Sequence, residues 1–500
     1  MSERPPQPSA LRVAESDDVA IALEAIAAGT TVRVGTSSRR VSEAIPKGHK
    51  FALHAIAAGE PVHKFGFPIG RASADIADGA WVHSHNLATQ LAGATDYRFD
   101  PQIAATPPQV AVREFLGYRR GDGQVGTRNE IWILCTVGCV ANTARRIAER
   151  ASARFAERVD GIHAITHPFG CSQLGDDLAN TQNILASLAR HPNTGGVLIV
   201  GLGCESLQMK RLLGTIGTFD SERLRYFNAQ QSVDETEDGI AAVAELVEIA
   251  ANDRREPCPL SDLRIGLKCG GSDGFSGITA NPLVGRIADR ISAAGGTPIL
   301  TEIPEIFGAE HLLMARAQDQ AVFDGIVGVV NDFKRYFLDH GQPVSENPSP
   351  GNVAGGITTL EEKSLGAVQK GGHAQVTQVL RYGERALGHG LALLEAPGND
   401  AVSSTALVAA GATVLLFTTG RGTPLGFPVP TLKIASNTAL ATAKPNWIDF
   451  DAGQVIASGD IEAVADDLLD LVVATASGRP ARNEINGERE IAIWKNGVTL

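Results

Sequence analysis

The chain has 500 residues, a length that predicts about three domains and excludes one small folding unit. Its 56 Asp and Glu outnumber its 44 Lys and Arg, which gives a formal net charge of −12. This balance argues against nucleic acid or an anionic membrane surface as a partner, because both are bound through basic faces. A small anionic substrate stays compatible with the sequence, since a local pocket of Arg and Lys can oppose the global sign.

Apolar residues make up 43% of the chain and charged residues 20%, as is typical of a globular protein with sizeable cores. No run of about 18 apolar residues occurs, and the first residues lack the apolar core of a signal peptide. We therefore expect a cytoplasmic protein. Its six cysteines are too sparse for a disulfide framework, so they are core residues, reactive thiols or metal ligands.

The N-terminal region, over residues 15–95, carries one pattern four times: Ile, two residues, Gly, two residues, then an apolar position. The four instances begin at Ile26, Ile45, Ile56 and Ile76. Glycine between short apolar runs predicts turns that join short strands, and hence a compact all-β module. Chance in a stretch rich in Ala and Gly is the alternative. Residues 96–112 hold three prolines and have the composition of a linker.

From Ile131 onward, short buried-strand patterns alternate with helical patterns, which predicts parallel α/β architecture with the site at the carboxyl ends of the strands. We place a middle α/β domain at 113–255 and, after a polar break at 252–259, a C-terminal Rossmann-like α/β domain at 260–500. The first domain is expected to have strands at 131–137, 162–166 and 197–200, with helices at 143–155, 176–189 and 205–213. The second is expected to have strands at 264–268, 297–301, 391–394, 413–417 and 432–435.

Three cysteines, Cys171, Cys204 and Cys269, each follow a predicted strand and lie in or beside a glycine turn. Three thiolates from three loops would hold iron, and would leave one iron of a cubane cluster open to a substrate oxygen. The alternative is that all three are small buried side chains. Cys135 lies within an apolar strand, where packing is the simpler interpretation, and Cys139 and Cys258 receive no role.

Two histidines, His83 and His85, end the N-terminal module. In a strand, side chains two residues apart point to the same face, so the two imidazoles would share a metal or a substrate. A strand edge with two solvated histidines is equally compatible with this spacing.

Several glycine-rich loops are suited to bind anions through backbone N–H groups and hydroxyls. They cover residues 270–277, 355–363 and 420–423, and contain among others Ser272, Lys363 and Arg421. Neither a dinucleotide fingerprint nor a Walker A motif occurs. The residues thus indicate an enzyme that acts on a small polyhydroxy or carboxylate substrate with a metal as Lewis acid.

Ten strings spread over the chain resemble the altronate and galactarate dehydratase family of sugar-acid hydro-lyases. They are KGHKFAL (47–53), GFPIG (66–70), VHSHN (82–86), GCSQLGDD (170–177), GLGCE (201–205), CGGSDG (269–274), SGITANP (276–282), NPSPG (347–351), APGNDA (396–401) and TGRGTP (419–424). The resemblance implies an N-terminal β-clip module of the SAF type, a middle domain that dimerises, and a C-terminal Rossmann-like variant. One departure is Trp81, where the family's string has a further histidine.

The resemblance also implies a reaction: D-altronate loses water to give 2-dehydro-3-deoxy-D-gluconate, with iron as Fe2+ or an iron–sulfur cluster, or with Mn2+, as cofactor. We assign His83 or His85 as general acid or base. The iron is assigned to Cys171, Cys204 and Cys269, with Glu302 and Glu305 as alternative oxygen ligands. The residues assigned to substrate are Ser272, Asp273, Asn281, Thr358, Lys363, Arg421 and Thr423.

The expected partners are the sugar acid and a second copy of the chain. The alternatives left open are a galactarate dehydratase, a sulfo-lyase of the same family, and a carbohydrate-binding or regulatory protein on the same scaffold.

Overall fold

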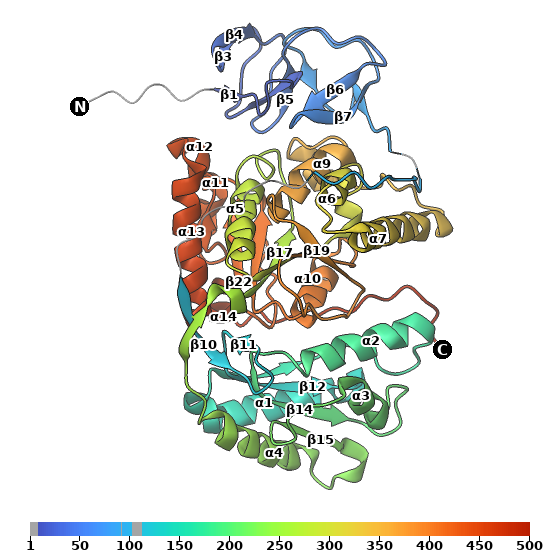
Figure 1. The fold of residues 1–500 in the computed structure, drawn as a ribbon, viewed down its shortest axis with the longest axis vertical. Coiled ribbons are helices and arrows are strands. Elements are labelled where there is room, and N and C mark those ends of the chain that lie inside the picture. Colours follow the sequence, from blue (N-terminus) through green and yellow to red (C-terminus); the bar gives the residue numbers. More distant parts are fainter. Residues whose placement is uncertain (1–8, 92, 103–112) are drawn as a thin grey trace, which may run out of the picture.

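The structure, a computed structural model, describes residues 9–91, 93–102 and 113–500. An N-terminal β module, a C-terminal α/β domain and a middle α/β domain are stacked along the long axis, with the C-terminal domain between the other two (Figure 1). In these described ranges, no helix has both the length and the apolar character needed to cross a membrane. Most of the predicted linker, residues 103–112, lies outside the described residues.

The N-terminal module is all-β, as the repeated pattern predicts. Its strands are β1 (Ala10–Leu11), β2 (Val19–Ala22), β3 (Thr31–Val34), β4 (Ser37–Arg40), β5 (Lys50–Ala52), β6 (Pro61–Lys64), β7 (Phe67–Ala72), β8 (Trp81–Val82) and β9 (Leu87–Ala88). The four isoleucines of the pattern pair with one another in antiparallel bridges, Ile26 with Ile45 and Ile56 with Ile76. The four glycines of the pattern all have a positive φ, between 76° and 88°. Glycine adopts this conformation without the steric cost that a Cβ brings, so the repeat sets the turns.

The middle domain has a parallel sheet in the order β13-β12-β14-β15. Its elements are β12 (Glu130–Cys135), α1 (Ala141–Phe155), β13 (Gly161–Ile165), α2 (Gly175–Leu188), β14 (Thr194–Gly201), α3 (Met209–Ile216), β15 (Leu224–Asn228) and α4 (Glu235–Ala250). The predicted strands and the first two helices lie where the alternation places them. The third helix begins at Met209, later than the expected 205, because the loop before it is held by Glu205, whose carboxylate accepts hydrogen bonds from the backbone of Leu202 and Gly203.

The C-terminal domain has a seven-stranded parallel sheet in the order β19-β20-β18-β17-β21-β22-β23. Its strands are β17 (Arg264–Cys269), β18 (Thr297–Leu300), β19 (Val376–Leu380), β20 (Leu391–Leu394), β21 (Val414–Thr419), β22 (Thr431–Ala435) and β23 (Phe450–Asp451). Its helices are α5 (Ala280–Ala293), α6 (Glu310–Met314), α7 (Gln320–Asp339), α8 (Pro350–Ala354), α9 (Leu360–Ala367), α10 (Asp400–Ala409), α11 (Thr438–Ala443), α12 (Gln454–Ser458), α13 (Ile461–Ala476) and α14 (Arg482–Asn486). This is the predicted Rossmann-like arrangement, and it places the carboxyl ends of β17 and β18 next to each other.

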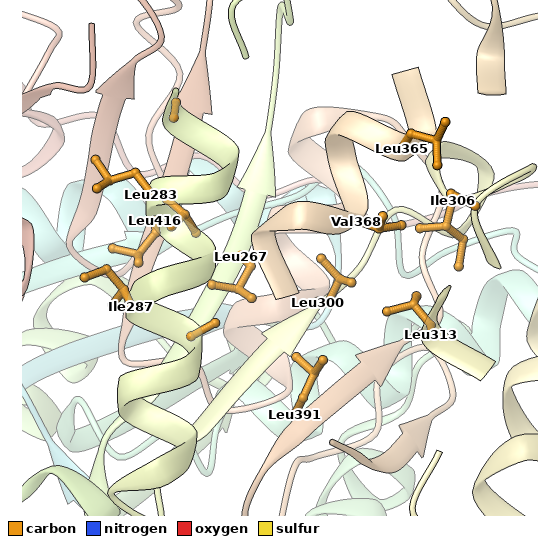
Figure 2. Close-up of a cluster of buried hydrophobic side chains, with 14 of the residues drawn as sticks. Leu267, Leu283, Ile287, Leu300, Ile306, Leu313, Leu365, Val368, Leu391 and Leu416 are labelled. Atoms are coloured by element: carbon orange, nitrogen blue, oxygen red, sulfur yellow. The ribbon is translucent and has the colours of Figure 1, made fainter. Parts of the chain in front are cut away.

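Leucine and isoleucine side chains from the sheet and from α5 fill the core of this domain. Figure 2 shows Leu267 of β17 beside Leu283 and Ile287 of α5, with Leu300 of β18 farther from that helix. These side chains are at most 1% exposed, so each stabilises the fold by roughly 2 kcal/mol relative to exposure. This packed core lies next to the carboxyl ends of β17 and β18 and fixes the positions of the loops that follow these two strands.

The polar segment 252–259, predicted as a break between domains, contains a strand. This strand, β16 (Glu256–Pro259), pairs antiparallel with β10 (Glu114–Arg119), which also pairs with β11 (Val125–Gly126). The sequence analysis missed this strand because its two prolines argue against a strand. They are tolerated here because β16 is a short edge strand, where a missing backbone N–H leaves no hydrogen bond unmade. The two α/β domains are therefore joined by a small sheet.

Candidate active site

The site begins where β17 ends, with Lys268 and Cys269, both of which are buried. The neighbouring strand β18 ends at Leu300, and Glu302 follows in a left-handed conformation with a φ of 72°. Left-handed backbone is costly for a residue with a side chain and is often retained at functional sites. The conformation leads into the 3-10 turn Ile303–Glu305, which brings a second carboxylate to the same place.

Glu302 is completely buried and paired with two lysines. Lys268 donates a hydrogen bond to one carboxylate oxygen, and Lys370 lies 2.8 Å from the other. Lys268 also lies 2.8 Å from Asp400, and Lys370 lies 2.8 Å from the Cys269 sulfur. Burial alone would raise the pKa of Glu302, but the two lysines outweigh burial and lower it. The carboxylate is therefore ionised, as a buried charge with two close partners must be.

Glu305 is the second carboxylate, and Lys363 of α9 lies 2.8 Å from it. The Lys363 ammonium also donates to the Asn347 side-chain oxygen at 3.0 Å. The Cys269 sulfur lies 3.4 Å from Glu305 and 3.5 Å from Glu302. Burial and the nearby Glu302 raise the pKa of Cys269 to about 12, so the thiol is protonated at neutral pH.

Cys269, Glu302 and Glu305 offer three donor atoms within 4.8 Å of one another, the spacing of a metal site. The groups around these three side chains bear on their predicted role as iron ligands. Lysine ammonium groups already contact all three donors, through Lys268, Lys370 and Lys363. A dication would add charge where three ammonium groups already balance the carboxylates. As the side chains lie, this set does not fit iron.

A cavity of about 280 Å³ opens beside these groups. Its lining is almost entirely polar and comprises Cys269, Gly270, Gly271, Ser272, Glu305, Asn347, Ser349, Asn352, Lys363, Gly398, Asn399 and Asp400. Of the predicted substrate residues, Ser272 and Lys363 line it. A cation, several amides and hydroxyls at the carboxyl ends of parallel strands suit a small polyhydroxy anion.

Two other predicted substrate residues are structural. Asp273 accepts hydrogen bonds from Ser276 in its own loop and from Ser436, which follows β22. Asn281, buried in the first turn of α5, accepts from Thr418 and donates to the Gly366 carbonyl. These hydrogen bonds hold the loops around the site, and neither residue lines the cavity.

Arg421 and Thr423 lie beyond the lining. The Arg421 guanidinium is exposed and donates to the Gly351 carbonyl at 2.9 Å, near the rim. The Thr423 hydroxyl accepts a hydrogen bond from the backbone of Leu425. Arg421 is the one of the two that could turn toward a bound anion.

The N-terminal module rests on the loops behind this cavity. Lys50 and Lys64 of the module lie 2.8 and 2.7 Å from the two carboxylate oxygens of Glu362, and all three side chains are almost fully buried. Lys50 also donates to Thr358, whose hydroxyl donates to Glu362. Thr358, predicted to bind substrate, is thus part of the contact between domains. Burial alone would raise the pKa of Glu362, but the two lysines lower it.

The two predicted catalytic histidines do not share a strand face, because β8 ends at Val82 and residues 83–86 form a turn. The turn is closed by Asn86, whose side chain accepts from the His83 backbone at 2.9 Å. His83 is buried and stacked on Trp81, with ring centroids 4.9 Å apart, while His85 is exposed.

His83 instead has His49 beside it, with ring centroids 5.0 Å apart. Burial lowers the pKa of His83 to about 4, helped by the nearby Lys50, and burial lowers the pKa of His49 as well. The Nδ1 atoms of both rings are buried without a hydrogen-bond partner among the described residues. His49, to which the sequence analysis gave no role, lies beside His83 in the place where His85 was expected.

The structure does not bring the three predicted iron cysteines together. Cys171 and Cys204 are exposed in the middle domain, whereas Cys269 is buried among lysines and carboxylates in the C-terminal domain. The prediction rested on equivalent positions after strands, but the strands belong to two different sheets.

Sequence reasoning missed Lys268 and Lys370, which hold Glu302 in place. One signal was available: Lys268 directly follows the apolar middle of a predicted buried strand, and a buried lysine requires a partner. Lys370 gives no such signal, because it lies in a turn whose burial depends on the whole fold.

Buried charges around a polar cavity at the carboxyl ends of parallel strands define an enzyme site rather than a binding module without chemistry. Three family models cover the chain: "Altronate/galactarate dehydratase SAF domain" at 8–90, "D-galactarate dehydratase/Altronate hydrolase, second domain" at 117–251, and "D-galactarate/Altronate dehydratase, C-terminal" at 260–499.

Curated relatives match over nearly the whole length. An altronate dehydratase of Escherichia coli is 51% identical, over 98% of this chain and 99% of its own. One of Bacillus subtilis is 48% identical, over 98% and 100%. The galactarate dehydratase (L-threo-forming) of Escherichia coli is 36% identical, over 94% and 93%. The chain belongs to the altronate/galactarate dehydratase family, and it is a hydro-lyase whose N-terminal module is a SAF domain.

Proposed function

We propose that this chain removes water from D-altronate to give 2-dehydro-3-deoxy-D-gluconate. The observation that carries the proposal is the match of about half of all positions, across all three domains, with two altronate dehydratases. The polar cavity at the ends of β17 and β18 supplies the place for such a substrate.

The cavity lining supports a substrate with one carboxylate. Of the side chains that line it, Lys363 alone is cationic, while Ser272, Asn347 and Asn352 offer hydrogen bonds to hydroxyls. Galactarate has a carboxylate at each end, and the lining holds Glu305 and Asp400 but no second cationic side chain for the other carboxylate. Like charges in a confined site cost free energy, which favours the aldonate.

The reaction removes the proton on C2 and expels the hydroxyl on C3, and negative charge grows on the substrate carboxylate as an enediolate. An ammonium group fixed beside that carboxylate stabilises this charge more in the transition state than in the ground state. We assign this role to Lys363, which Glu305 and Asn347 hold at the cavity wall.

Two groups are proposed for the proton transfers. Glu305 lines the cavity itself, with its carboxylate between Lys363 and the Cys269 thiol. His83 lies on the SAF side, and its low pKa leaves it neutral at pH 7. His85 is the weaker candidate because it is exposed. The iron that the resemblance implies stays a prediction, and none of these steps uses it.

The experiment is turnover of D-altronate and galactarate by the purified chain, with the keto acid and the loss of one water followed by mass spectrometry. We expect kcat/KM to be at least 100-fold higher for D-altronate. Equal or higher values for galactarate would assign the chain to the other branch of its family. No turnover of either sugar acid, with or without added Fe2+ or Mn2+, would reject the proposal.

We infer further that the chain forms a homodimer through its middle domain. β15 is the edge strand of the middle sheet, and its Tyr226 is 52% exposed. An uncovered edge strand with an exposed aromatic side chain supports pairing with a second copy. Sedimentation of the purified chain tests this, and Tyr226→Lys should shift the mass toward the monomer.

A further inference from the structure

A second cavity, of about 470 Å³, lies at the junction of the middle and C-terminal domains, away from the site described above. Three segments line it: the turn between β10 and β11, the turn that leads from α2 into β14, and the loop that leads from α3 into β15. Figure 1 shows β10 and β11 at this junction. The charged side chains in the lining are Arg119, Arg120, Arg190, Arg223, Asp122 and Asp220. Arginines therefore outnumber aspartates here, in a chain whose net charge is −12.

Three of these four arginines have carboxylate partners. Arg120 and Arg223 share Asp253, whose two oxygens lie 2.9 and 2.8 Å from them. Arg119 pairs with two acidic side chains that lie outside the lining. The guanidinium of the exposed Arg190 forms no ion pair among the described residues. Arg190 is thus the lining arginine whose charge the protein leaves open.

Two further arginines, from the C-terminal domain, lie close to Arg190. Arg264 begins β17, and Arg385 lies between β19 and β20. Arg385 donates a hydrogen bond at 2.5 Å to the side-chain oxygen of Gln124, which lines the cavity. Burial lowers the pKa of Arg385 to about 10, and the positive charges of Arg190 and Arg264 lower it further toward that value. The three guanidinium groups therefore form one cluster beside the cavity.

This arginine cluster (Arg190, Arg264 and Arg385) has unused hydrogen-bond donors. The Nε and Nη1 atoms of Arg385 and the Nε atom of Arg264 are buried and have no acceptor among the described residues. In native structures nearly all buried polar groups have a partner, and a buried charge without one is costly. Donors of this kind in a cluster of like charges indicate a binding site for an anion.

The charge of the arginine cluster is only partly compensated. Asp122 is the lining carboxylate whose charge acts on both Arg264 and Arg385, yet it forms an ion pair with neither. Its side chain instead accepts a hydrogen bond from the Gln124 backbone at 3.1 Å. Three guanidinium groups and one carboxylate leave an excess of two positive charges. An anion that matches this excess carries a charge close to −2.

A phosphate monoester fits this excess better than a single carboxylate. It carries a charge of about −1.5 to −2 at pH 7 and offers three acceptor oxygens, which suit the fork of donors on a guanidinium. The rest of the lining includes Phe219, which is 37% exposed, together with the apolar Ala189 and Leu224. A cavity of this volume has the size of a small-molecule site and holds more than a free phosphate ion.

We propose that this cavity binds a small phosphate monoester, with Arg190, Arg264 and Arg385 as the residues that hold its phosphate group. The site is separate from the proposed dehydration. Arg264 begins β17 and Cys269 ends it, so the two sites lie at opposite ends of one strand, roughly 16 Å apart along it. Because Arg190 belongs to the middle domain and the other two arginines to the C-terminal domain, the ligand bridges the two domains.

The test is calorimetric titration of the full purified chain, in a buffer without phosphate, with four probes: glycerol 3-phosphate, adenosine monophosphate, inorganic phosphate and citrate. At least one of the two esters should bind at one site per chain, ten-fold or more tightly than inorganic phosphate and citrate. Arg190→Gln and Arg385→Met should each weaken this binding at least ten-fold. Arg150→Gln, which changes an exposed arginine elsewhere in the middle domain, is the matched control and should bind as wild type does.

The thermal midpoint without ligand separates a binding role of Arg385 from a structural one. Arg385→Met should keep or raise the midpoint, because it removes a buried charge without an acceptor. A midpoint lower by more than about 5 °C would show that the guanidinium holds the fold together, and would overturn its assignment. Arg190→Gln changes an exposed side chain, so its binding can be measured in a folded protein whatever Arg385→Met does.

Three results of the titrations would overturn the proposal: no saturable binding of either ester at millimolar concentration, citrate binding as tightly as the esters, or wild-type binding by Arg190→Gln. The ester that binds should also raise the thermal midpoint of wild type, as a ligand of the folded state does. None of these measurements uses a sugar acid. A failure of this site and a failure of the dehydratase assignment are therefore distinguishable.

Discussion

The ammonium group of Lys370 lies 2.8 Å from the sulfur of Cys269, and the two side chains are only 1% and 2% exposed. The same ammonium lies 2.8 Å from Glu302, so one lysine serves both a thiol and a carboxylate. Burial would lower the pKa of Lys370, but Cys269 and Glu302 outweigh burial and raise it. The charges of the site are thus set by the protein before any substrate arrives.

Removing Lys370 should destabilise the fold strongly. In Lys370→Met, the fully buried Glu302 carboxylate keeps Lys268 as a partner but loses one of the two ammonium groups that balance its charge. We expect the free energy of unfolding to fall by about 3 kcal/mol, as when one partner of a buried ion pair is removed. Urea denaturation measures this. Arg335→Met, which removes an exposed pair with Asp332, is the control and should cost under about 1 kcal/mol. Equal losses for the two variants would show that the buried network contributes no more than a surface pair.

A negative charge added to the cavity should weaken substrate binding without unfolding the protein. Asn347→Asp changes hardly any volume and places a carboxylate beside Lys363. If Lys363 binds the substrate carboxylate, kcat/KM for D-altronate should fall at least ten-fold, about 1.4 kcal/mol, mainly through KM. Steady-state kinetics checks this, with Gln320→Glu on exposed surface as the control. Unchanged kinetics in Asn347→Asp would show that the substrate carboxylate does not bind beside Lys363 in this cavity.

The two histidines of the SAF turn should differ in their effect on rate. If His83 acts as acid or base, His83→Asn should lower kcat at least 100-fold, the usual range for such a group. His85→Asn should lower kcat less than three-fold, because this ring is exposed. The pH profile of kcat/KM in Glu305→Gln tests Glu305, the other candidate for proton transfer. A His83→Asn enzyme with normal kcat would leave Glu305 as the group that moves the proton.

Stability should depend on pH through His191, a fully buried ring stacked on Trp132. Burial lowers its pKa to about 3, and its neutral form accepts from the Asn193 backbone N–H at 3.1 Å. Between pH 6.5 and about 3 the unfolded chain binds a proton that the folded chain does not. The free energy of unfolding should therefore fall as pH drops through this window, by about 1.4 kcal/mol per pH unit from this group.

The measurement is urea denaturation at pH 7 and pH 5. His191→Gln should flatten the dependence by most of that amount, whereas His85→Gln, on the surface, should leave it unchanged. A wild-type slope in His191→Gln would mean that other buried groups account for the whole effect.

Much of the fold could be predicted because its periodicity is local. The glycine of each N-terminal repeat needs a positive φ, so the repeat itself encodes its turns. The strand at 391–394 and most of the strand at 413–417 are continuous apolar runs, as buried parallel strands are. Strand β16 escaped because its pairing with β10 is set by a partner about 140 residues away, and its two prolines argue locally against a strand.

The site was harder to predict because its members come from separate segments. Glu302 and Glu305 were found together, since one short turn carries both. Cys269 was grouped with Cys171 and Cys204 because each follows a strand and lies beside a glycine. Their strands belong to two different sheets, which the local sequence does not reveal. The lysine partners and His49 could not be found from spacing, because burial and contact over long sequence distances decide what those side chains do.

The contact of Lys50 and Lys64 with Glu362 has a consequence for how the SAF domain is held. A shift of that domain by a few ångströms would separate two buried ammonium groups from a buried carboxylate and leave all three charges without partners. The observed position of the SAF domain is therefore favoured over neighbouring positions. We expect the SAF domain to stay bound to the C-terminal domain even after the chain between them is cut.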